Sequence, residues 1–191
     1  MEKEKKTAIT REKLLKACES LIEASSDPMA VTSRQIAAES GVQAAMINYC
    51  FGSREKLIYE VFYRKYQNAL SEASVQEIVS SDMSPAEKLK ALHFMIASFL
   101  VSNYKLTKAI TSFVLFERDL SRESFSFALV KEHFGGKMDD VSCRMIAYEL
   151  STMMQLVIYR HEDIRDHMGL DLTDPEALKS YIDMRIDLLL P

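Results

Sequence analysis

The chain has 191 residues, of which 48% are hydrophobic and 27% charged, and its formal net charge at pH 7 is −4. This is ordinary for a globular protein and leaves room for one large domain, or for a small domain fused to a larger one. The three cysteines, Cys18, Cys50 and Cys143, are widely spaced and odd in number, which argues against a disulfide framework or a zinc site and favours reduced thiols.

The first ten residues, MEKEKKTAIT, are charged where a secretory signal would need an apolar segment. No apolar run approaches the roughly 18 residues that a membrane-spanning helix needs. We therefore expect a cytoplasmic protein with no membrane partner.

Charge is distributed unevenly along the chain. Residues 1–66 hold 11 Lys and Arg against 9 Asp and Glu, whereas the rest holds 13 against 19. A slightly basic N-terminal part fits contact with a polyanion, although so small an excess is weak evidence alone.

The few glycines and prolines, together with apolar residues that recur at spacings of three and four, predict an all-α fold. Thr10 is expected to open the first helix, Thr32 and Gln35 have the spacing of a capping box at the start of the second, and Ser84-Pro85 opens another. The expected helices cover 10–25, 33–40, 43–50, 54–80, 85–102, 104–119, 121–134, 138–165 and 174–190. The helix 54–80 would join the two halves of the chain without a flexible hinge.

Residues 33–52 have the pattern of a helix-turn-helix motif. Small or apolar side chains occupy the positions that two helices crossing at a tight turn require: Ile36, Ala37, Gly41, Val42 and Ile47. Gly41 supplies the left-handed conformation that ends the first helix. Turn, apolar partners and following cap agree, so the motif is specific.

The second helix of the motif carries no charge, so we expect it to read base edges while its neighbours hold the phosphates. With Ile47 inward on a helical wheel, Ala45 and Tyr49 point outward. Arg34 and, on the other side, Arg54 and Lys56 would flank this face. A basic arm is also conceivable, although a charged, solvated tail is the simpler interpretation; its members would be Lys3, Lys5, Lys6 and Arg11.

These residues resemble the N-terminal domain of the tetracycline-repressor (TetR) family of bacterial transcriptional regulators. The resemblance covers roughly residues 10–62 and rests on Thr32, Ile36, Ala37, Gly41, Val42, Tyr49, Phe51, Ser53, Glu55 and Leu57. It implies a DNA-binding domain in residues 1–57 and a helical domain for ligand binding and dimerisation in residues 58–191.

The resemblance also implies roles for individual residues. Phosphate contacts fall on Ser33, Arg34, Tyr49 and Arg54, with Lys56 beside them. Base contacts fall on Gln43, Ala44, Ala45, Met46 and Asn48. Two positions depart from the family pattern: Asn48 stands where a tyrosine is usual, and Arg54 replaces a lysine. The first departure leaves open which of Asn48 and Tyr49 touches a base; the second keeps the positive charge.

The family dimer is made by its last two long helices, here 138–165 and 174–190, which implies a homodimer. The apolar stripe available for this seam consists of Leu178, Tyr181, Ile182, Arg185, Leu188 and Leu189. A core stripe in a monomer would look the same.

The aromatic residues and methionines of the second half suggest a pocket for an apolar or aromatic effector, although ordinary core packing explains most of them. The candidate ligand contacts are His93, Phe99, Asn103, Phe113 and Tyr148. The run RHEDIRDHM at residues 160–168 is more typical of a solvated helix end than of a metal site. No catalytic arrangement or nucleotide fingerprint occurs, so we expect neither an enzyme nor a bound cofactor.

The sequence therefore favours a homodimeric, ligand-responsive DNA-binding regulator, with repression as its expected effect, that binds a two-fold operator in double-stranded DNA. The alternative is a dimeric helical scaffold whose helix-turn-helix head binds a protein partner rather than DNA.

Overall fold

The computed structural model describes residues 2–119 and 125–191, with side chains described for residues 5–119 and 126–191. Within these ranges the chain folds into eleven α-helices and one 3-10 helix, and contains no strand. The all-α prediction is confirmed.

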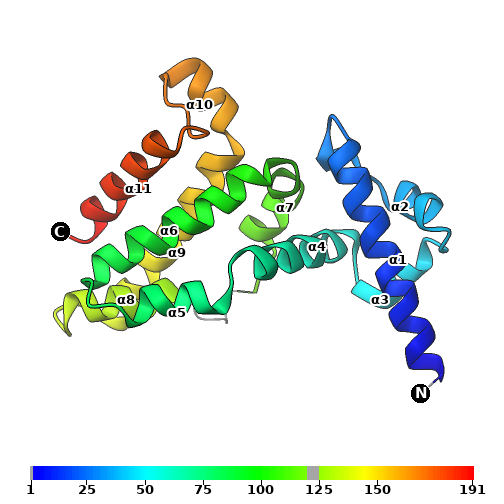
Figure 1. Ribbon diagram of the computed structural model, residues 1–191, viewed down its shortest axis with the longest axis horizontal. Helices are drawn as coiled ribbons and strands as arrows, with labels where there is room; N and C mark the ends of the chain where they lie inside the picture. Colours follow the sequence, from blue (N-terminus) through cyan, green and yellow to red (C-terminus); the bar gives the residue numbers. More distant parts are fainter. Residues whose placement is uncertain (1, 120–124) are drawn as a thin grey trace. The chain divides into compact units, whose positions relative to one another are not determined.

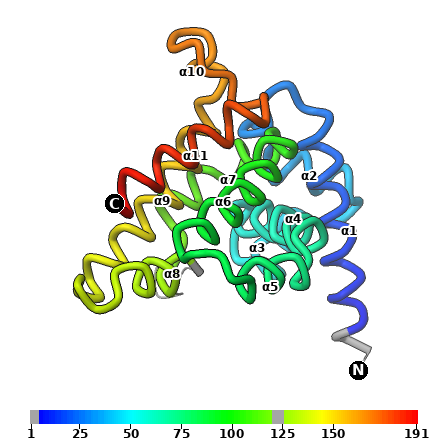
Figure 2. Tube along the Cα trace, turned by 60° about the vertical axis from the view of Figure 1, so that its left-hand side comes forward, coloured from blue at the N-terminus to red at the C-terminus, as the bar shows by residue number. Residues whose placement is uncertain are grey.

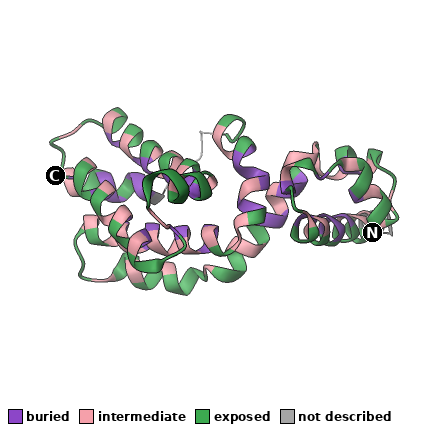
Figure 3. Ribbon diagram, turned by 90° about the horizontal axis from the view of Figure 1, so that it is seen from above, coloured by how far each residue is buried: buried purple, intermediate pink, exposed green. Residues whose placement is uncertain are grey.

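The helices form two compact units, each with its own core. The N-terminal unit comprises Met1–Asn68 and Asn103–Glu117, and the C-terminal unit comprises Ala69–Ser102 and Arg118–Pro191. The boundary expected after residue 57 falls inside a helix, and a later segment of the chain returns to the N-terminal unit. Within each unit the buried residues lie on helix faces turned towards other helices (Figure 3).

The N-terminal unit is built around its first helix (Figure 1). Its elements are α1 (Glu2–Ala24), η1 (Pro28–Ala30), α2 (Ser33–Ser40), α3 (Ala45–Phe51), α4 (Arg54–Ala69) and α7 (Tyr104–Phe116). Leu14, Cys18 and Ile22 are fully buried on one face of α1 because they are spaced four residues apart. Helix α1 contacts α2, α3, η1 and α7, so it is the packing surface for the whole unit.

The expected start of the first helix at Thr10 is wrong. Helix α1 begins at Glu2, and the hydroxyl of Thr10 donates a 3.0 Å hydrogen bond to the Lys6 carbonyl one turn earlier. The glutamates and lysines of the first residues favour helix, which extends it beyond the capping signal. Arg11 therefore lies on an ordered helix and not on a mobile arm; Lys5 and Lys6 are exposed on it, and the side chain of Lys3 lies outside the described residues.

The continuous helix expected over 54–80 is also wrong. The helix breaks at Leu70 and Ser71, leaving α4 and a separate α5 (Glu72–Ser80). Ser71 caps α5, since its side-chain oxygen accepts a 3.1 Å hydrogen bond from the Ser74 amide. The rigid connection inferred from the sequence is therefore interrupted within two residues.

The C-terminal unit is built around α6, which contacts α5, α8, α9 and α11. Its elements are α5, α6 (Pro85–Ser102), α8 (Phe125–Phe134), α9 (Asp140–Tyr159), α10 (His161–Met168) and α11 (Pro175–Leu189), traced in Figure 2. The Ser84 amide donates a 2.8 Å hydrogen bond to Glu87, whose amide donates to the Ser84 hydroxyl. This capping box confirms the predicted start of α6.

Two other predicted helices differ from the described structure. The helix expected over 138–165 is divided at Arg160 into α9 and α10, so it is not one long element. The helix expected over 121–134 is described only from Phe125 as α8, and its predicted start lies outside the described residues.

The three cysteines are free, as expected, with Cys18 and Cys143 buried and Cys50 half-buried. Burial raises the pKa of the Cys18 thiol to about 12, so that this thiol is protonated and unreactive at neutral pH. Among the helices of the described residues, none combines the length and the apolar character needed to cross a bilayer.

Candidate functional site

Hydrogen bonds fix both ends of α2, the first helix of the helix-turn-helix motif. At its start, the Thr32 amide donates to Gln35 Oε1 over 2.8 Å, and the Gln35 amide donates to the Thr32 hydroxyl over 3.3 Å. This is the capping box expected from the sequence. The start of the helix-turn-helix motif is therefore fixed by two local side chains.

At its end, α2 is closed by Gly41, whose φ of 65° lies in the left-handed region. The Val42 amide donates to the Ala37 carbonyl over 3.2 Å and the Gly41 amide to the Ala38 carbonyl over 3.4 Å. These bonds form a Schellman motif. A Cβ built on Gly41 meets no atom within 4 Å, so glycine is needed here for its backbone conformation and not for space.

Helix α3 has seven residues and presents one face to the core and the other to solvent. Ile47 is 1% exposed, whereas Ala45 and Asn48 are exposed and Tyr49 is 64% exposed. Met46 is half-buried beside this face. The outward face predicted from the helical period is confirmed, and it carries no charged side chain.

The turn before α3 contributes two further exposed residues. Gln43 and Ala44 precede the helix, which begins at Ala45 and not at residue 43 as expected. The Met46 amide donates to the Gln43 carbonyl over 2.9 Å, so the turn leads directly into the helix. Gln43, Ala44, Ala45, Met46 and Asn48 thus follow one another at the solvent side of the motif.

Arg11 of α1 holds the C-terminal end of α3. Its Nη1 donates to the Cys50 carbonyl, its Nη2 donates to the Glu60 carboxylate of α4, and its Cζ lies 4.2 Å from the centroid of the Phe51 ring. One side chain therefore ties together α1, α3 and α4. Sequence reasoning missed this role because the two hydrogen-bond partners lie 39 and 49 residues away, beyond any local pattern.

Arg54 has an internal role that the resemblance does not indicate. Its Nη1 donates to the carbonyls of Met29 and Val31 over 3.2 and 2.7 Å, and its Nε donates to Glu55 over 2.9 Å. The side chain is only 26% exposed. Arg54 thus fastens η1 to the start of α4, and its Nη1 and Nε are engaged in internal hydrogen bonds.

Arg34 of α2 and Lys56 of α4 are exposed cations on the helices that precede and follow α3 in the chain. Lys56 extends back towards the end of α3, where its Nζ lies 3.8 Å from the Cβ that would be built on Gly52. Ser33, the remaining expected phosphate contact, is half-buried at the first position of α2. Both cations that the sequence proposed as phosphate contacts are therefore exposed.

Ion pairs between α1 and α4 neutralise other basic residues of the N-terminal unit. Arg64 pairs with Glu12 at 2.7 Å, and Lys65 pairs with Glu19 at 3.0 Å and with Glu23 at 2.9 Å. The positive charge available to a polyanion near the motif therefore comes from Arg34, Lys56 and the exposed lysines of α1.

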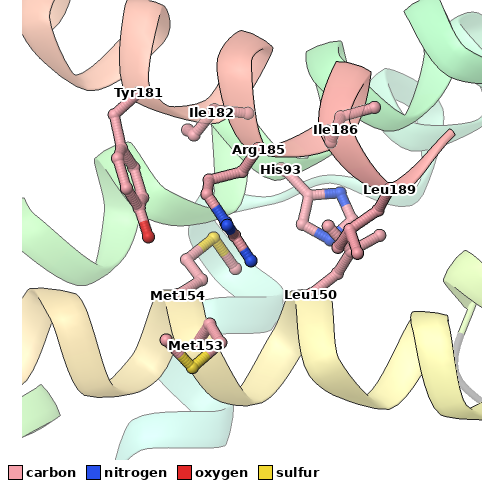
Figure 4. A pocket seen from close by; sticks show the side chains of 9 residues that line it. All are labelled: His93, Leu150, Met153, Met154, Tyr181, Ile182, Arg185, Ile186 and Leu189. Atoms are coloured by element: carbon pink, nitrogen blue, oxygen red, sulfur yellow. The ribbon is translucent and has the colours of Figure 1, made fainter. Parts of the chain in front are cut away.

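A pocket lies in the C-terminal unit between α6, α9 and α11 (Figure 4). Most of its walls are aliphatic or thioether side chains, and its lining residues are His93, Leu150, Met153, Met154, Tyr181, Ile182, Arg185, Ile186 and Leu189. Its cavity volume is about 20 Å³. That is room for about one water molecule and is far below the several hundred Å³ of a typical small-molecule site.

His93 is neutral in this pocket. Its Nδ1 lies 2.8 Å from the Leu89 carbonyl, which only accepts, so Nδ1 carries the proton. Burial lowers the pKa of the ring, because desolvation disfavours the charged form. The imidazole therefore contributes no charge at pH 7.

Of the five candidate ligand contacts named from the sequence, one lines this pocket and four do not. His93 lines the pocket, whereas Phe99 is buried elsewhere on α6 and Tyr148 is half-buried on α9. Asn103 and Phe113 belong to the N-terminal unit, where the Phe113 ring lies 5.3 Å from that of Tyr59. The α9 residues that line the pocket are not among these candidates. They are aliphatic or thioether side chains, and such residues carry no signal that separates a pocket from a core.

The stripe expected to form the dimer seam mostly faces its own chain. Leu178 and Ile182 are 3% and 4% exposed, and Tyr181, Arg185 and Leu189 line the pocket. Only Leu188, at 65%, is exposed. Leu178 and Ile182 are therefore core residues of their own chain and are not exposed to form a dimer interface.

Exposed apolar side chains do occur on the outer faces of α9 and α11, which contact each other. The large ones are Val141, Met145, Met153, Leu156, Met184 and Leu188. On α9 the positions 141, 145 and 156 fall within one third of a helical turn, so they share a face.

Within the described ranges, no group of His, Cys, Asp and Glu is placed to hold a metal ion. Neither a protein-family model nor a curated protein matches the chain.

Proposed function

We propose that the chain is a DNA-binding transcriptional regulator that reads a major groove with α3. The observation that carries the proposal is the uncharged, exposed face of α3, which follows a capped α2 and the Gly41 turn, with the exposed cations Arg34 and Lys56 on the helices before and after it. Short side chains such as Ala45 let a helix approach base edges, while cations on its flanks contact phosphates. This division of labour is what a recognition helix requires.

A homodimer is part of the proposal, because a two-fold operator presents two half-sites one helical turn apart. The apolar side chains exposed on α9 and α11 support it, since contiguous exposed apolar surface on a soluble domain often marks an interface. The interface proposed here uses Met145 and Leu156 of α9 with Met184 and Leu188 of α11, and not the buried Leu178 and Ile182.

Regulation by a small effector, with repression of a gene in its absence, follows from the family resemblance. An effector lowers operator affinity only if it binds the DNA-free conformation more tightly than the DNA-bound one. Because the chain breaks at Leu70 and Ser71, one continuous helix does not connect effector binding to DNA binding. We propose that the two are coupled through the segment at this break.

The competing function is a helical scaffold whose head binds a protein partner. The internal use of Arg11, Arg54, Arg64 and Lys65 favours it, because these residues offer less positive charge to a polyanion than the sequence suggests. The exposed ring of Tyr49 would suit a protein surface as well as a phosphate.

The salt dependence of DNA binding separates the two functions. If Arg34 and Lys56 each neutralise one phosphate in each subunit of a dimer, four phosphates are neutralised. A plot of the logarithm of the association constant against the logarithm of the salt concentration should then have a slope of about −4. Fluorescence anisotropy with a duplex selected from random DNA by the purified protein would measure it. If selection at about 50 mM salt enriches no sequence and the protein retains no duplex, the regulator proposal is wrong.

The oligomeric state is tested by two exposed methionines. Met145→Glu on α9 should dissociate the dimer, because it places a charge in the proposed apolar interface. Met168→Glu changes a methionine that is 78% exposed at the end of α10 and should leave the dimer intact. Sedimentation equilibrium gives both results; a monomeric wild-type chain, or a Met145→Glu dimer as tight as wild type, would remove the dimer from the proposal.

A further inference from the structure

The pocket of the C-terminal unit contains one positive charge. Of its lining side chains only Arg185 is cationic, because burial keeps His93 neutral. Arg185 is half-buried and extends from α11 towards α9, between Tyr181 and the His93 ring in Figure 4. A guanidinium partly removed from water among apolar walls is unfavourable unless an anion or polar groups compensate it.

The carboxylates nearest in sequence are already engaged elsewhere. Asp183 pairs with Lys179 at 2.5 Å, and Asp187 pairs with Lys90 at 2.5 Å. One turn away on α11, the neighbours of Arg185 are Tyr181 and Leu189, which are not acidic. In the part of the chain that the structure describes, Arg185 forms no ion pair with a carboxylate.

Tyr181 does not supply the missing negative charge. Burial raises the pKa of its phenol, and the positive charge of Arg185 only partly opposes that rise. The phenol therefore stays protonated at neutral pH and offers an O–H donor beside the guanidinium. Arg185 and Tyr181 together form a pair of donors that lacks an anionic acceptor.

We propose that this pocket binds an organic monocarboxylate with an apolar body. The carboxylate accepts two parallel hydrogen bonds from Arg185, and the hydroxyl of Tyr181 donates a third. The apolar body of the ligand packs against Met153, Met154 and Ile182 and displaces solvent from them. A single guanidinium matches a single negative charge, which disfavours phosphate esters with two or more.

The pocket must open to admit such a ligand, since its present cavity of about 20 Å³ holds about one water. Leu150 and two methionines form its α9 wall, and Met153 is 39% exposed. Unbranched thioether chains rotate and repack at low cost, so the wall can yield without unfolding α9. Identification of the ligand as the effector rests on the proposed function; the binding itself does not.

Isothermal titration of the full chain with octanoate and octanamide, in the absence of DNA, tests the inference. Both probes have the same apolar body, and only octanoate carries a charge. Octanoate should bind at least about tenfold more tightly than octanamide, and also than acetate, which lacks the apolar body. Arg185→Gln should abolish the preference for octanoate over octanamide, and Lys179→Gln, an exposed cation on the same helix, should retain it.

Equal affinity of the wild-type chain for octanoate and octanamide would overturn the proposal, as would an unchanged preference in Arg185→Gln. If Arg185→Gln does not fold, the comparison of the two probes on the wild type and on Lys179→Gln decides. Because no DNA is present, failure of DNA binding leaves these titrations unaffected, so the two proposals fail independently.

Discussion

Replacing Arg54 with alanine is expected to lower the free energy of unfolding by about 2 kcal/mol, because charge-assisted hydrogen bonds, here to two part-buried carbonyls, contribute about 1.5–3 kcal/mol. The substitution leaves the carbonyls of Met29 and Val31 without their guanidinium donor and releases η1 from α4. Urea denaturation followed by circular dichroism measures the loss. The resemblance alone predicts a different result, in which Arg54 contributes to DNA affinity and not to stability.

Lys56→Ala is the matched control, two residues along the same helix. The Lys56 side chain is exposed and forms no hydrogen bond or ion pair within the described residues, so its removal should change stability by less than about 0.5 kcal/mol. It should instead weaken binding to all DNA sequences alike. The magnitude of the salt slope should fall by about 1 for each subunit, which is about 2 for a dimer. Equal stability of the Arg54 and Lys56 variants would show that the bonds of Arg54 are not structural.

Asn48→Ala is expected to change which base is preferred at one position of each half-site, with a loss of discrimination of about 1–3 kcal/mol. Asparagine pairs with adenine through two hydrogen bonds, and the side chains of Ala45 and Met46 suit contact with thymine methyl groups. No arginine lies on the exposed face of α3 to read guanine. Half-sites selected from random DNA should therefore be rich in A·T pairs under α3.

Arg34→Ala provides the comparison for Asn48→Ala. Arg34 is exposed on α2, and if it contacts a phosphate as proposed, its replacement should lower affinity evenly without altering the selected sequence. If both variants select the wild-type sequence, the assignment of Asn48 as a base reader is wrong. If Tyr49→Phe changes the preferred base instead, the two neighbouring residues exchange their roles.

The sequence predicted those parts of the fold that depend on local chemistry. The capping boxes at Thr32 and Ser84 and the left-handed Gly41 all act within a few residues, and each appears as expected. The outward face of α3 was also predictable, because the helical period relates it to the buried Ile47. Local signals suffice where the interaction itself is local.

Interruptions of helices without glycine or proline were not predictable in the same way. The chain breaks at Leu70 and Ser71 and again at Arg160, where no strong breaker stands. Ser71 is a weak signal in retrospect, because serine side chains compete with the helix for backbone amides. Packing within each unit decides such breaks, and packing depends on residues far along the chain.

The candidate site divides along the same line. Arg11 and Arg54 were missed as structural residues because their partners are remote, and basic side chains near a recognition helix suggest DNA first. The sequence named His93 and pointed to the methionines of the second half, but it did not separate the pocket from core and seam, because aliphatic and methionine residues on α9 and α11 have one pattern for all three. Only three-dimensional contacts separate these possibilities.

The shortness of α3 has a thermodynamic consequence. A helix of seven residues without a side-chain cap is far below the length of about 12–15 residues at which isolated helices become marginally stable. Its conformation is therefore maintained from behind, by burial of Ile47 and by the grip of Arg11 on the Cys50 carbonyl. Local unfolding of the residues around Ile47 would therefore remove the exposed face of α3 as well. That face is conditional: it exists only for as long as the residues buried beneath it keep their contacts.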